Sequence, residues 1–316
     1  MLIEHLETLY RKEAETRNQL PHNPFRASRA GHCIRARALD KLGVKGEPLQ
    51  PRRIAVFKHG DIIHDALTRD IQKALGWRFI SERDLTAKHR LFAVIEGVEV
   101  EFHPDGAFQN EEQIGIVELK SMADFSFDKA REGEIDYDYL CQAWCYAEFT
   151  NFNPVVFIAY RKETSHMVEI VFDRHEKEKI VTQRLGGDAI EIARTEPLLI
   201  TEIKTPFDLS VEQEVREKFK TLAAVKSIED LPDGVFRIEP ETVKVQGKVK
   251  AEELKAKYGE PEQSGSWYAF RTGRKILGFP CSYCSHKSGR PWPFSCYPNA
   301  QLEMQGNKPV WVVSDV

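Results

Sequence analysis

The chain of 316 residues is long enough for one large domain or two, and its 41% hydrophobic and 30% charged residues are ordinary for a soluble globular protein. Its longest apolar runs, such as Pro154 to Tyr160, exclude a membrane-spanning helix, and its first residues show no signal peptide, so we expect a cytoplasmic protein. The net charge of −4 does not indicate a general affinity for polyanions, and it leaves local basic patches open.

The first quarter of the chain has the periodicity of helices. Apolar residues recur at helical spacing over residues 2–18, 28–42 and 53–75. Pro21 and Pro24 separate the first two of these segments, and Gly43 is placed to end the second.

The middle of the chain changes to the period of strands. We predict strands over residues 78–85, 91–96, 98–108, 114–121, 155–160 and 166–172. Helical patterns over 135–149 and 174–194 lie between and after them. This order predicts an α/β fold with a central mixed β-sheet flanked by helices.

The last hundred residues give a weaker signal. Residues 211–225 have a helical pattern, 229–265 are charged and rich in turn residues, and 309–313 form a short apolar run without an assigned role. We therefore predict two parts, a core with the N-terminal helices over residues 1–205 and a helical or irregular extension over residues 206–316.

Two carboxylates and a lysine lie where a predicted hairpin would bring them together. Glu118 and Lys120 are two residues apart in one strand, so they project from the same face. The polar residues 110–113 predict a turn, and a hairpin folded about its middle places Asp105 opposite Glu118, with Cβ atoms about 5 Å apart. Two such carboxylates repel each other unless a cation lies between them, and the backbone carbonyl of Leu119 would add an oxygen ligand that hard divalent cations prefer.

A cation at this hairpin would be suited to the hydrolysis of phosphodiesters. It would activate water and stabilise the charge that develops on phosphorus, while Lys120 polarises a phosphoryl oxygen or orients the water. The hairpin pattern alone is weak, because Glu-Leu-Lys strands and Asp-Gly turns are common. Its weight increases with His64 on a preceding helix and with Gln142 and Tyr146, which share one face of a following helix.

The same residues carry a resemblance to a known nuclease family. In chain order the motifs are Gly60-x-x-x-His64, Pro104-Asp105, Glu118-Leu-Lys120 and Gln142-x-x-x-Tyr146. This set, over about residues 28–172, resembles the RecB-like exonuclease branch of the PD-(D/E)xK superfamily. The resemblance implies a restriction-endonuclease-like core in which His64, Asp105 and Glu118 bind Mg²⁺ or Mn²⁺. It also implies that Lys120 assists catalysis and that Gln142 and Tyr146 serve the active site and DNA.

Four of the six cysteines flank the motif-bearing segment. Cys281-Ser-Tyr-Cys284 is followed by Cys296 after eleven residues, and Cys33 lies far upstream. In a reducing cytoplasm such cysteines indicate metal binding or burial rather than disulfides. Their distribution resembles the iron–sulfur subgroup of these nucleases, which includes the CRISPR-associated RecB-like exonucleases, the AddB nuclease domain and phage relatives. That resemblance implies a [4Fe–4S] cluster that joins the N- and C-terminal segments.

The ligands and the metal of this cluster have alternatives. The last cysteine spacing is longer than the family usually has, so His286 is an alternative ligand to Cys296. Four thiolates, or three with a histidine, suit Zn²⁺ as well as iron–sulfur. We interpret Cys141 and Cys145, which share the predicted helix with Gln142, as buried structural thiols.

The resemblance predicts a divalent-metal-dependent DNA exonuclease of a prokaryotic cell or a phage-infected host. Its substrate would be single-stranded DNA or DNA with free ends, and recombination or CRISPR adaptation proteins are candidate partners in recombination, repair or CRISPR adaptation. Two alternatives are a zinc-stabilised endonuclease and a non-catalytic DNA-binding subunit with a structural metal clasp. Two basic segments have two possible roles, contact with DNA or a solvated charged surface. They are residues 271–292 and a basic run of Arg26, Arg29, Arg35 and Arg37.

Overall fold

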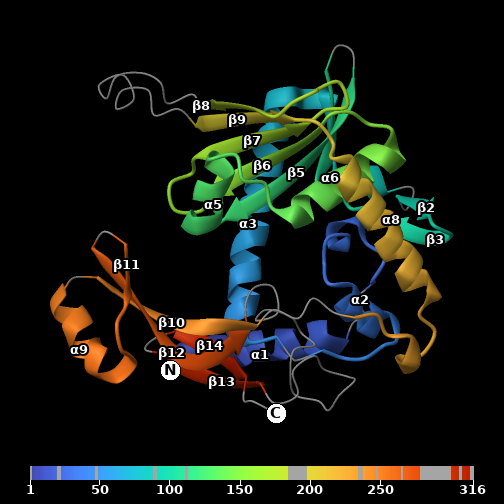
Figure 1. Cartoon of the computed structure of the whole chain (residues 1–316). Helices are drawn as coiled ribbons and strands as arrows, with labels where there is room; N and C mark the ends of the chain where they lie inside the picture. Colours follow the sequence, from blue (N-terminus) through green and yellow to red (C-terminus); the bar gives the residue numbers. More distant parts are fainter. Residues whose placement is uncertain are drawn as a thin grey trace, which may run out of the picture. The chain divides into compact units, whose positions relative to one another are not determined.

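The computed structural model describes most of the chain, and this part divides into two compact units (Figure 1). One unit consists of Met1–His32 and Leu49–Lys226, and the other of Cys33–Pro48 and Ser227–Val316. The described residues are 2–19, 23–46, 49–87, 91–110, 113–183, 198–233, 238–246, 248–264, 266–277, 300–305 and 308–313.

A seven-stranded mixed sheet forms the centre of the first unit, and it follows the strand order β1-β4-β5-β6-β7-β9-β8. The strands of this sheet are β1 (Phe79–Ser81), β4 (Gly106–Gln109), β5 (Ile114–Met122), β6 (Val155–Arg161), β7 (Met167–Phe172), β8 (Ile180–Gln183) and β9 (Leu199–Thr205). β5 pairs with β6 in parallel, as β7 does with β9, and the other neighbours are antiparallel. A separate hairpin joins β2 (Phe92–Ile95) to β3 (Val98–Glu101). The predicted α/β fold with a mixed sheet is confirmed.

Helices cover both faces of this sheet (Figure 1). The helices of the first unit are α1 (Leu2–Gln19), α3 (Pro51–Leu75), α4 (Glu82–Thr86), α5 (Asp124–Arg131), α6 (Tyr137–Thr150) and α8 (Leu209–Ala224), with short 3-10 turns η1 (Ala27–Arg29) and η2 (Gly76–Arg78). Among the described residues, no helix has the length and apolar character that a membrane span requires.

The long helix α3 covers one face of the sheet. Pro51 occupies its first turn, where a missing N–H costs nothing, and Gly76 ends it with a positive φ of 59° that favours glycine. Leu67 and Ile71 of α3 pack against an apolar cluster that contains Val117 and Leu119 of β5. This packing fixes the helix that carries His64 relative to the central strand.

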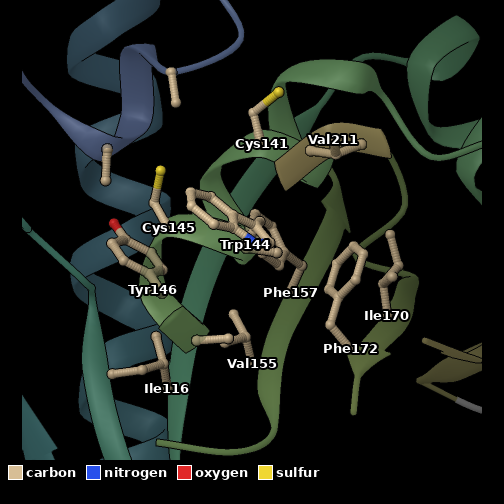
Figure 2. Packing of buried hydrophobic residues seen from close by; sticks show 14 of the residues in the cluster. Ile116, Cys141, Trp144, Cys145, Tyr146, Val155, Phe157, Ile170, Phe172 and Val211 are labelled. Carbon is tan, nitrogen blue, oxygen red and sulfur yellow. The ribbon is translucent and has the colours of Figure 1, made fainter. Parts of the chain in front are cut away.

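Helix α6 covers the opposite face. Asp136 caps its N-terminus by accepting a hydrogen bond from the Asp138 N–H at 2.9 Å. Figure 2 shows side chains of this helix and of the sheet, among them Trp144 and Phe157, in one cluster of buried hydrophobic residues. Cys141 and Cys145 of this helix are buried cysteines, so their predicted burial is confirmed.

The strand β5 is enclosed between these two helices. Its middle residues are buried, and alternate side chains point to opposite faces of the sheet. Val117 and Leu119 belong to the cluster under α3, whereas Glu118 and Lys120 contact Gln142 of α6. The alternation therefore places both predicted functional side chains of β5 on the α6 face.

The second unit is built on a smaller sheet. Its strands are β10 (Ile238–Gln246), β11 (Glu262–Ser264), β12 (Trp267–Leu277), β13 (Ala300–Gln305) and β14 (Lys308–Val313), and its helices are α2 (Ile34–Lys41) and α9 (Lys248–Tyr258), with a 3-10 turn η3 (Ile228–Asp230). The strand order is β10-β12-β14-β13, and β11 pairs with β12. β14 gives the apolar run over 309–313 a place in this sheet.

The basic run of the sequence is not a single surface. Arg35 and Arg37 of α2 are 3% and 0% exposed, so neither the solvated surface nor the DNA contact that we considered applies to them. A buried guanidinium needs acceptors, and Arg35 donates to the Pro232 carbonyl at 3.1 Å. Arg26 is about half exposed and lies 3.8 Å from Glu101 in the first unit.

Two predicted strands end earlier than their patterns indicated. The strand predicted over 78–85 ends at Ser81, whose hydroxyl caps α4 by accepting from the Asp84 N–H. The strand predicted over 98–108 is divided into β3 and β4 by a segment that contains Pro104, which has no N–H for a ladder. The segment between the strands carries Asp105.

Two predicted helices are also wrong in part. The helix predicted over 28–42 is interrupted between η1 and α2, around Gly31. The helix predicted over 174–194 is wrong for its first half, where irregular backbone leads into β8, and residues 184–194 lie outside the described part of the chain. The charged, turn-rich stretch 229–265 contains β10, α9 and β11.

Candidate active site

Asp105 lies immediately before β4, at the position that continues the hairpin register. The last pair of β4 and β5 is Gly106 with Val117, so the next two positions along are Asp105 and Glu118, as predicted. Asp105 Oδ2 accepts a hydrogen bond from the backbone N–H of Leu119 at 2.6 Å. The carboxylate thus continues the ladder beyond the end of β4, which fixes its position through the backbone of β5.

His64 reaches this carboxylate from α3. Its Nε2 lies 2.7 Å from Asp105 Oδ1. The hydrogen bond to Asp105 raises the pKa of His64 above its usual value against the opposing effect of burial, and the charges of Asp105 and Glu118 add to the rise. The pair therefore favours an imidazolium bound to a carboxylate.

Glu118 is a buried carboxylate, 4% exposed, with three hydrogen-bond donors around it. Its Oε1 accepts from Lys120 Nζ at 2.6 Å and from Gln142 Nε2 at 2.8 Å, and its Oε2 lies 3.2 Å from the Tyr146 hydroxyl. Burial raises the pKa of Glu118 to about 7, although the charge of Lys120 opposes the rise. Glu118 is thus the acid of the site whose protonation responds near neutral pH.

Lys120 is held as a charged ammonium beside Glu118. Burial acts to lower its pKa, but the charge and the hydrogen bond of Glu118 outweigh burial and raise the pKa above its usual value. Its Nζ also donates to Gln142 Oε1 at 3.2 Å. An ammonium has three N–H groups, and the third has no hydrogen-bond acceptor within the described part of the chain.

Gln142 and Tyr146 complete the network from α6. Gln142 Nε2 donates both to Glu118 and, at 2.9 Å, to the Tyr146 hydroxyl, while its Oε1 accepts from Lys120. The Tyr146 hydroxyl lies 3.1 Å from the backbone carbonyl of His103, so α6 also contacts the segment that precedes Asp105. Because every polar atom of the buried amide is satisfied, its orientation is fixed.

The structure brings all six residues of the sequence motifs into one connected region of the first unit. His64 and Asp105 form one pair, and Glu118, Lys120, Gln142 and Tyr146 form a network beside it. Asp105 and Glu118 are close enough for the charge of Asp105 to raise the pKa of Glu118.

The donor set of this region fits a hard divalent cation in its chemistry. It offers two carboxylates and one imidazole, and the Leu119 carbonyl faces the same side as the Leu119 N–H that Asp105 binds, because both groups of one strand residue point the same way. Among the described residues, however, no three side chains of His, Cys, Asp or Glu are gathered around one point. Asp105 instead pairs with His64 and Glu118 with Lys120, so an ion would have to displace these contacts.

The predicted cluster ligands are not brought together by what the structure describes. Cys281, Cys284 and Cys296, and the alternative ligand His286, lie outside the described residues. Cys33 lies directly before α2, is half-buried and forms no disulfide with another described cysteine.

Sequence reasoning missed two neighbours of the site. His103 contributes its backbone carbonyl to Tyr146, a role that no side-chain pattern reveals, and its Nδ1 lies 3.2 Å from Glu82 Oε1. Tyr139 lies three residues before Gln142 on the same helix face, and its ring centroid is 5.3 Å from Lys120 Nζ. Its spacing could have identified it as a neighbour of Gln142.

Comparisons with known proteins assign the chain to no family. No protein-family model matches the chain, and no curated protein matches it. Among solved structures, the crystal structure of the archaeal protein SSO0001 is similar over 72% of this chain and 87% of that chain. The two chains are 13% identical and superpose with a TM-score of 0.41, which indicates nothing about activity.

Proposed function

We propose that the protein is a divalent-metal-dependent deoxyribonuclease, and that it degrades DNA from free ends. The observation that carries this proposal is the placement of Asp105 opposite Glu118 at the end of one hairpin, with Lys120 bound to the carboxylate of Glu118. The resemblance of the ordered motifs to RecB-like exonucleases supports DNA as the substrate. A role in recombination, repair or CRISPR adaptation, with proteins of those pathways as partners, stays a prediction.

Asp105, Glu118, His64 and the Leu119 carbonyl are the groups that would hold Mg²⁺ or Mn²⁺. When bound, such an ion supplies activated water and neutralises charge on the phosphoryl oxygens. The residues of the chain then have separate tasks. Gln142 and Tyr146 hold Glu118 in place, and the third N–H of Lys120 is available to a phosphoryl oxygen.

The charges of the site suit a phosphodiester. Without an ion, His64 pairs with Asp105 and the ammonium of Lys120 pairs with Glu118. A divalent cation bound by a neutral His64 would leave one net positive charge, because two carboxylates offset the ion and Lys120 remains charged. One phosphodiester carries one negative charge, so the loaded site and its substrate are complementary.

Cleavage of end-labelled DNA in the presence of Mn²⁺ tests the proposal. We expect Asp105→Asn and Glu118→Gln each to lower the rate about 1,000-fold or more, because each removes a charge that holds the ion. Glu134→Gln is the matched control, since Glu134 is exposed and pairs only with Lys129 at 3.2 Å among the contacts of the described chain. It should cut DNA like the wild type.

The same assay separates the alternatives. Linear DNA degraded while closed circles stay intact supports an exonuclease, whereas linearised circles indicate an endonuclease. DNA retained without turnover in the wild type would indicate a non-catalytic binding subunit. Equal cleavage by the wild type and Asp105→Asn would contradict the proposed active site.

We further propose that Cys33, Cys281, Cys284 and Cys296 hold a [4Fe–4S] cluster, with Zn²⁺ as the alternative. The spacing of the cysteines supports this part of the proposal. An anaerobically purified protein with a broad visible absorption band and bound iron would agree with it. A colourless protein that contains zinc would overturn it in favour of the zinc alternative.

A further inference from the structure

The ammonium of Lys120 lies over two aromatic rings as well as beside Glu118. Its Nζ is 5.3 Å from the ring centroid of Tyr139 and 5.7 Å from that of Phe157. Both distances are within the range of about 6 Å in which a cation is attracted to the face of an aromatic ring. The two rings stack on each other, with centroids 5.5 Å apart and planes inclined by 29°.

This arrangement follows from elements that already build the site. Phe157 of β6 is the register partner of Glu118, so its side chain shares the α6 face of the sheet with Glu118 and Lys120. Tyr139 precedes Gln142 by three residues on α6, so the two project from adjacent positions of one helix face. Phe157 is buried and Tyr139 is half-buried, so the inner ring supports the outer one.

We propose that Tyr139 is a positioning residue for Lys120, whose ammonium the face of its ring holds in the active site. The catalytic part of this inference rests on the proposed nuclease function. The placement of Lys120 does not, because the rings and the ammonium are in contact whatever the protein does.

The ring matters most when a divalent cation is bound. Lys120 Nζ binds Glu118 Oε1 at 2.6 Å, and a divalent cation held by Asp105 and Glu118 would weaken this ion pair by repelling the ammonium. Lys120 has a long side chain with many rotamers, so it would be free to turn away once this ion pair is weakened. Gln142 and the Tyr139 ring are uncharged, and they continue to hold the ammonium where a phosphoryl oxygen can reach it.

The test measures the placement of Lys120 without DNA and without activity. The lysine Cε atoms are labelled with ¹³C, so that the signals of their bound protons can be observed. Protons above aromatic rings are shielded, so the Cε signal of Lys120 should lie upfield of the other lysine signals. The signal that is missing in Lys120→Arg identifies Lys120. We expect Tyr139→Phe to retain the upfield shift and Tyr139→Leu to lose a large part of it, because Leu has no ring.

Kinetics of DNA cleavage then test the consequence. We expect Tyr139→Leu to lower kcat about 10-fold with little change in KM. Tyr139→Phe, which keeps the ring, should retain most of the wild-type kcat. The matched control is Tyr137→Leu on the same helix, which removes the ring beneath Lys218, 4.7 Å from its Nζ. This control should leave the Lys120 signal in place.

Several results would overturn the inference. An unchanged Lys120 signal in Tyr139→Leu would show that the ring does not hold the ammonium. Equal losses of kcat in Tyr139→Phe and Tyr139→Leu would assign the effect to the hydroxyl, and a normal kcat in Tyr139→Leu would remove the catalytic part. If the wild type cuts no DNA, the proposed function fails, and the Lys120 signal still decides whether Tyr139 positions the ammonium.

Discussion

The two carboxylates of the site are held in different ways. Asp105 is bound by a backbone N–H of β5 and by His64 of α3, so its position follows from the strand register and one helix. Glu118 is bound by Lys120, Gln142 and Tyr146, which are all side chains, and its own side chain is 6% exposed against 13% for Asp105.

Because the two carboxylates are held differently, substitutions near them should differ in their effect on the free energy of unfolding. A carboxylate that the backbone fixes keeps its place when a neighbouring side chain changes. A buried carboxylate that side chains hold becomes unfavourable as soon as its cationic partner is removed. We therefore expect substitutions around Glu118 to change the free energy of unfolding more than those around Asp105.

The largest effect on stability should follow from Lys120→Met, which leaves Glu118 buried without a cation. We expect it to lower the free energy of unfolding by about 3–5 kcal/mol at pH 8. The loss should be smaller at pH 5, because Glu118 can then take up a proton. Denaturant unfolding at both pH values checks this, with Lys129→Met as the control at an exposed ion pair with Glu134. Equal losses in both variants would contradict the account of Glu118.

The pH dependence of stability should show the raised pKa of Glu118. Its pKa is about 7 in the folded protein against 4.5 for an ordinary glutamate, so the folded state binds the proton more tightly. The contribution of Glu118 to the free energy of unfolding is therefore fully present below pH 4.5. It is lost as the pH rises towards 7, by on the order of a few kcal/mol. The difference in unfolding free energy between the wild type and Glu118→Gln, measured across this range, should fall with pH. A flat difference would show that Glu118 titrates normally.

A moderate effect is expected from Tyr146→Phe. This variant removes a hydroxyl that lies within hydrogen-bond distance of Glu118, Gln142 and the His103 carbonyl, and it leaves a buried N–H of Gln142 without its acceptor. We expect a loss of about 1–3 kcal/mol in thermal or denaturant unfolding. Tyr160→Phe is the control, because the Tyr160 hydroxyl bonds Ser165 at the surface, and it should cost much less.

The smallest effect on the free energy of unfolding, a gain in stability, is expected from Gly60→Ala on α3, the helix that carries His64. A Cβ at Gly60 would meet Ser121 Oγ at 3.5 Å, which is an ordinary contact, and alanine favours a helix interior over glycine. We expect the variant to gain about 0.5–1 kcal/mol in unfolding free energy. Gly31→Ala is the contrast, because its Cβ would lie 2.7 Å from the Asp138 Cα, and it should destabilise the protein.

The sequence predicted the parts of the site that depend on short-range spacing. The polar residues 110–113 predicted a hairpin folded about their middle, and the register of β4 with β5 agrees with the placement of Asp105 opposite Glu118. The four-residue spacing of Gln142 and Tyr146 placed both on one helix face, which the structure turns towards Glu118.

The parts that failed depend on tertiary packing or lack a periodic signal. β8 is a strand at the edge of the sheet whose residues are all exposed, so no alternation of apolar side chains marks it, and a helical pattern was predicted there. The aromatic contact of Lys120 requires β6 to lie beside β5 in parallel, and one sequence does not give the partner of a strand. The burial of Arg35 and Arg37 depends equally on packing that no local pattern records.

The central claim is that Asp105 and Glu118 are two halves of one cation site, and titration with Mn²⁺ tests it most directly. Binding followed by calorimetry or by the electron paramagnetic resonance signal of free Mn²⁺ should weaken at least about 100-fold in both Asp105→Asn and Glu118→Gln, and not in Glu134→Gln. If either carboxylate variant bound Mn²⁺ as tightly as the wild type, the two residues would not share an ion, and the proposed active site would be wrong.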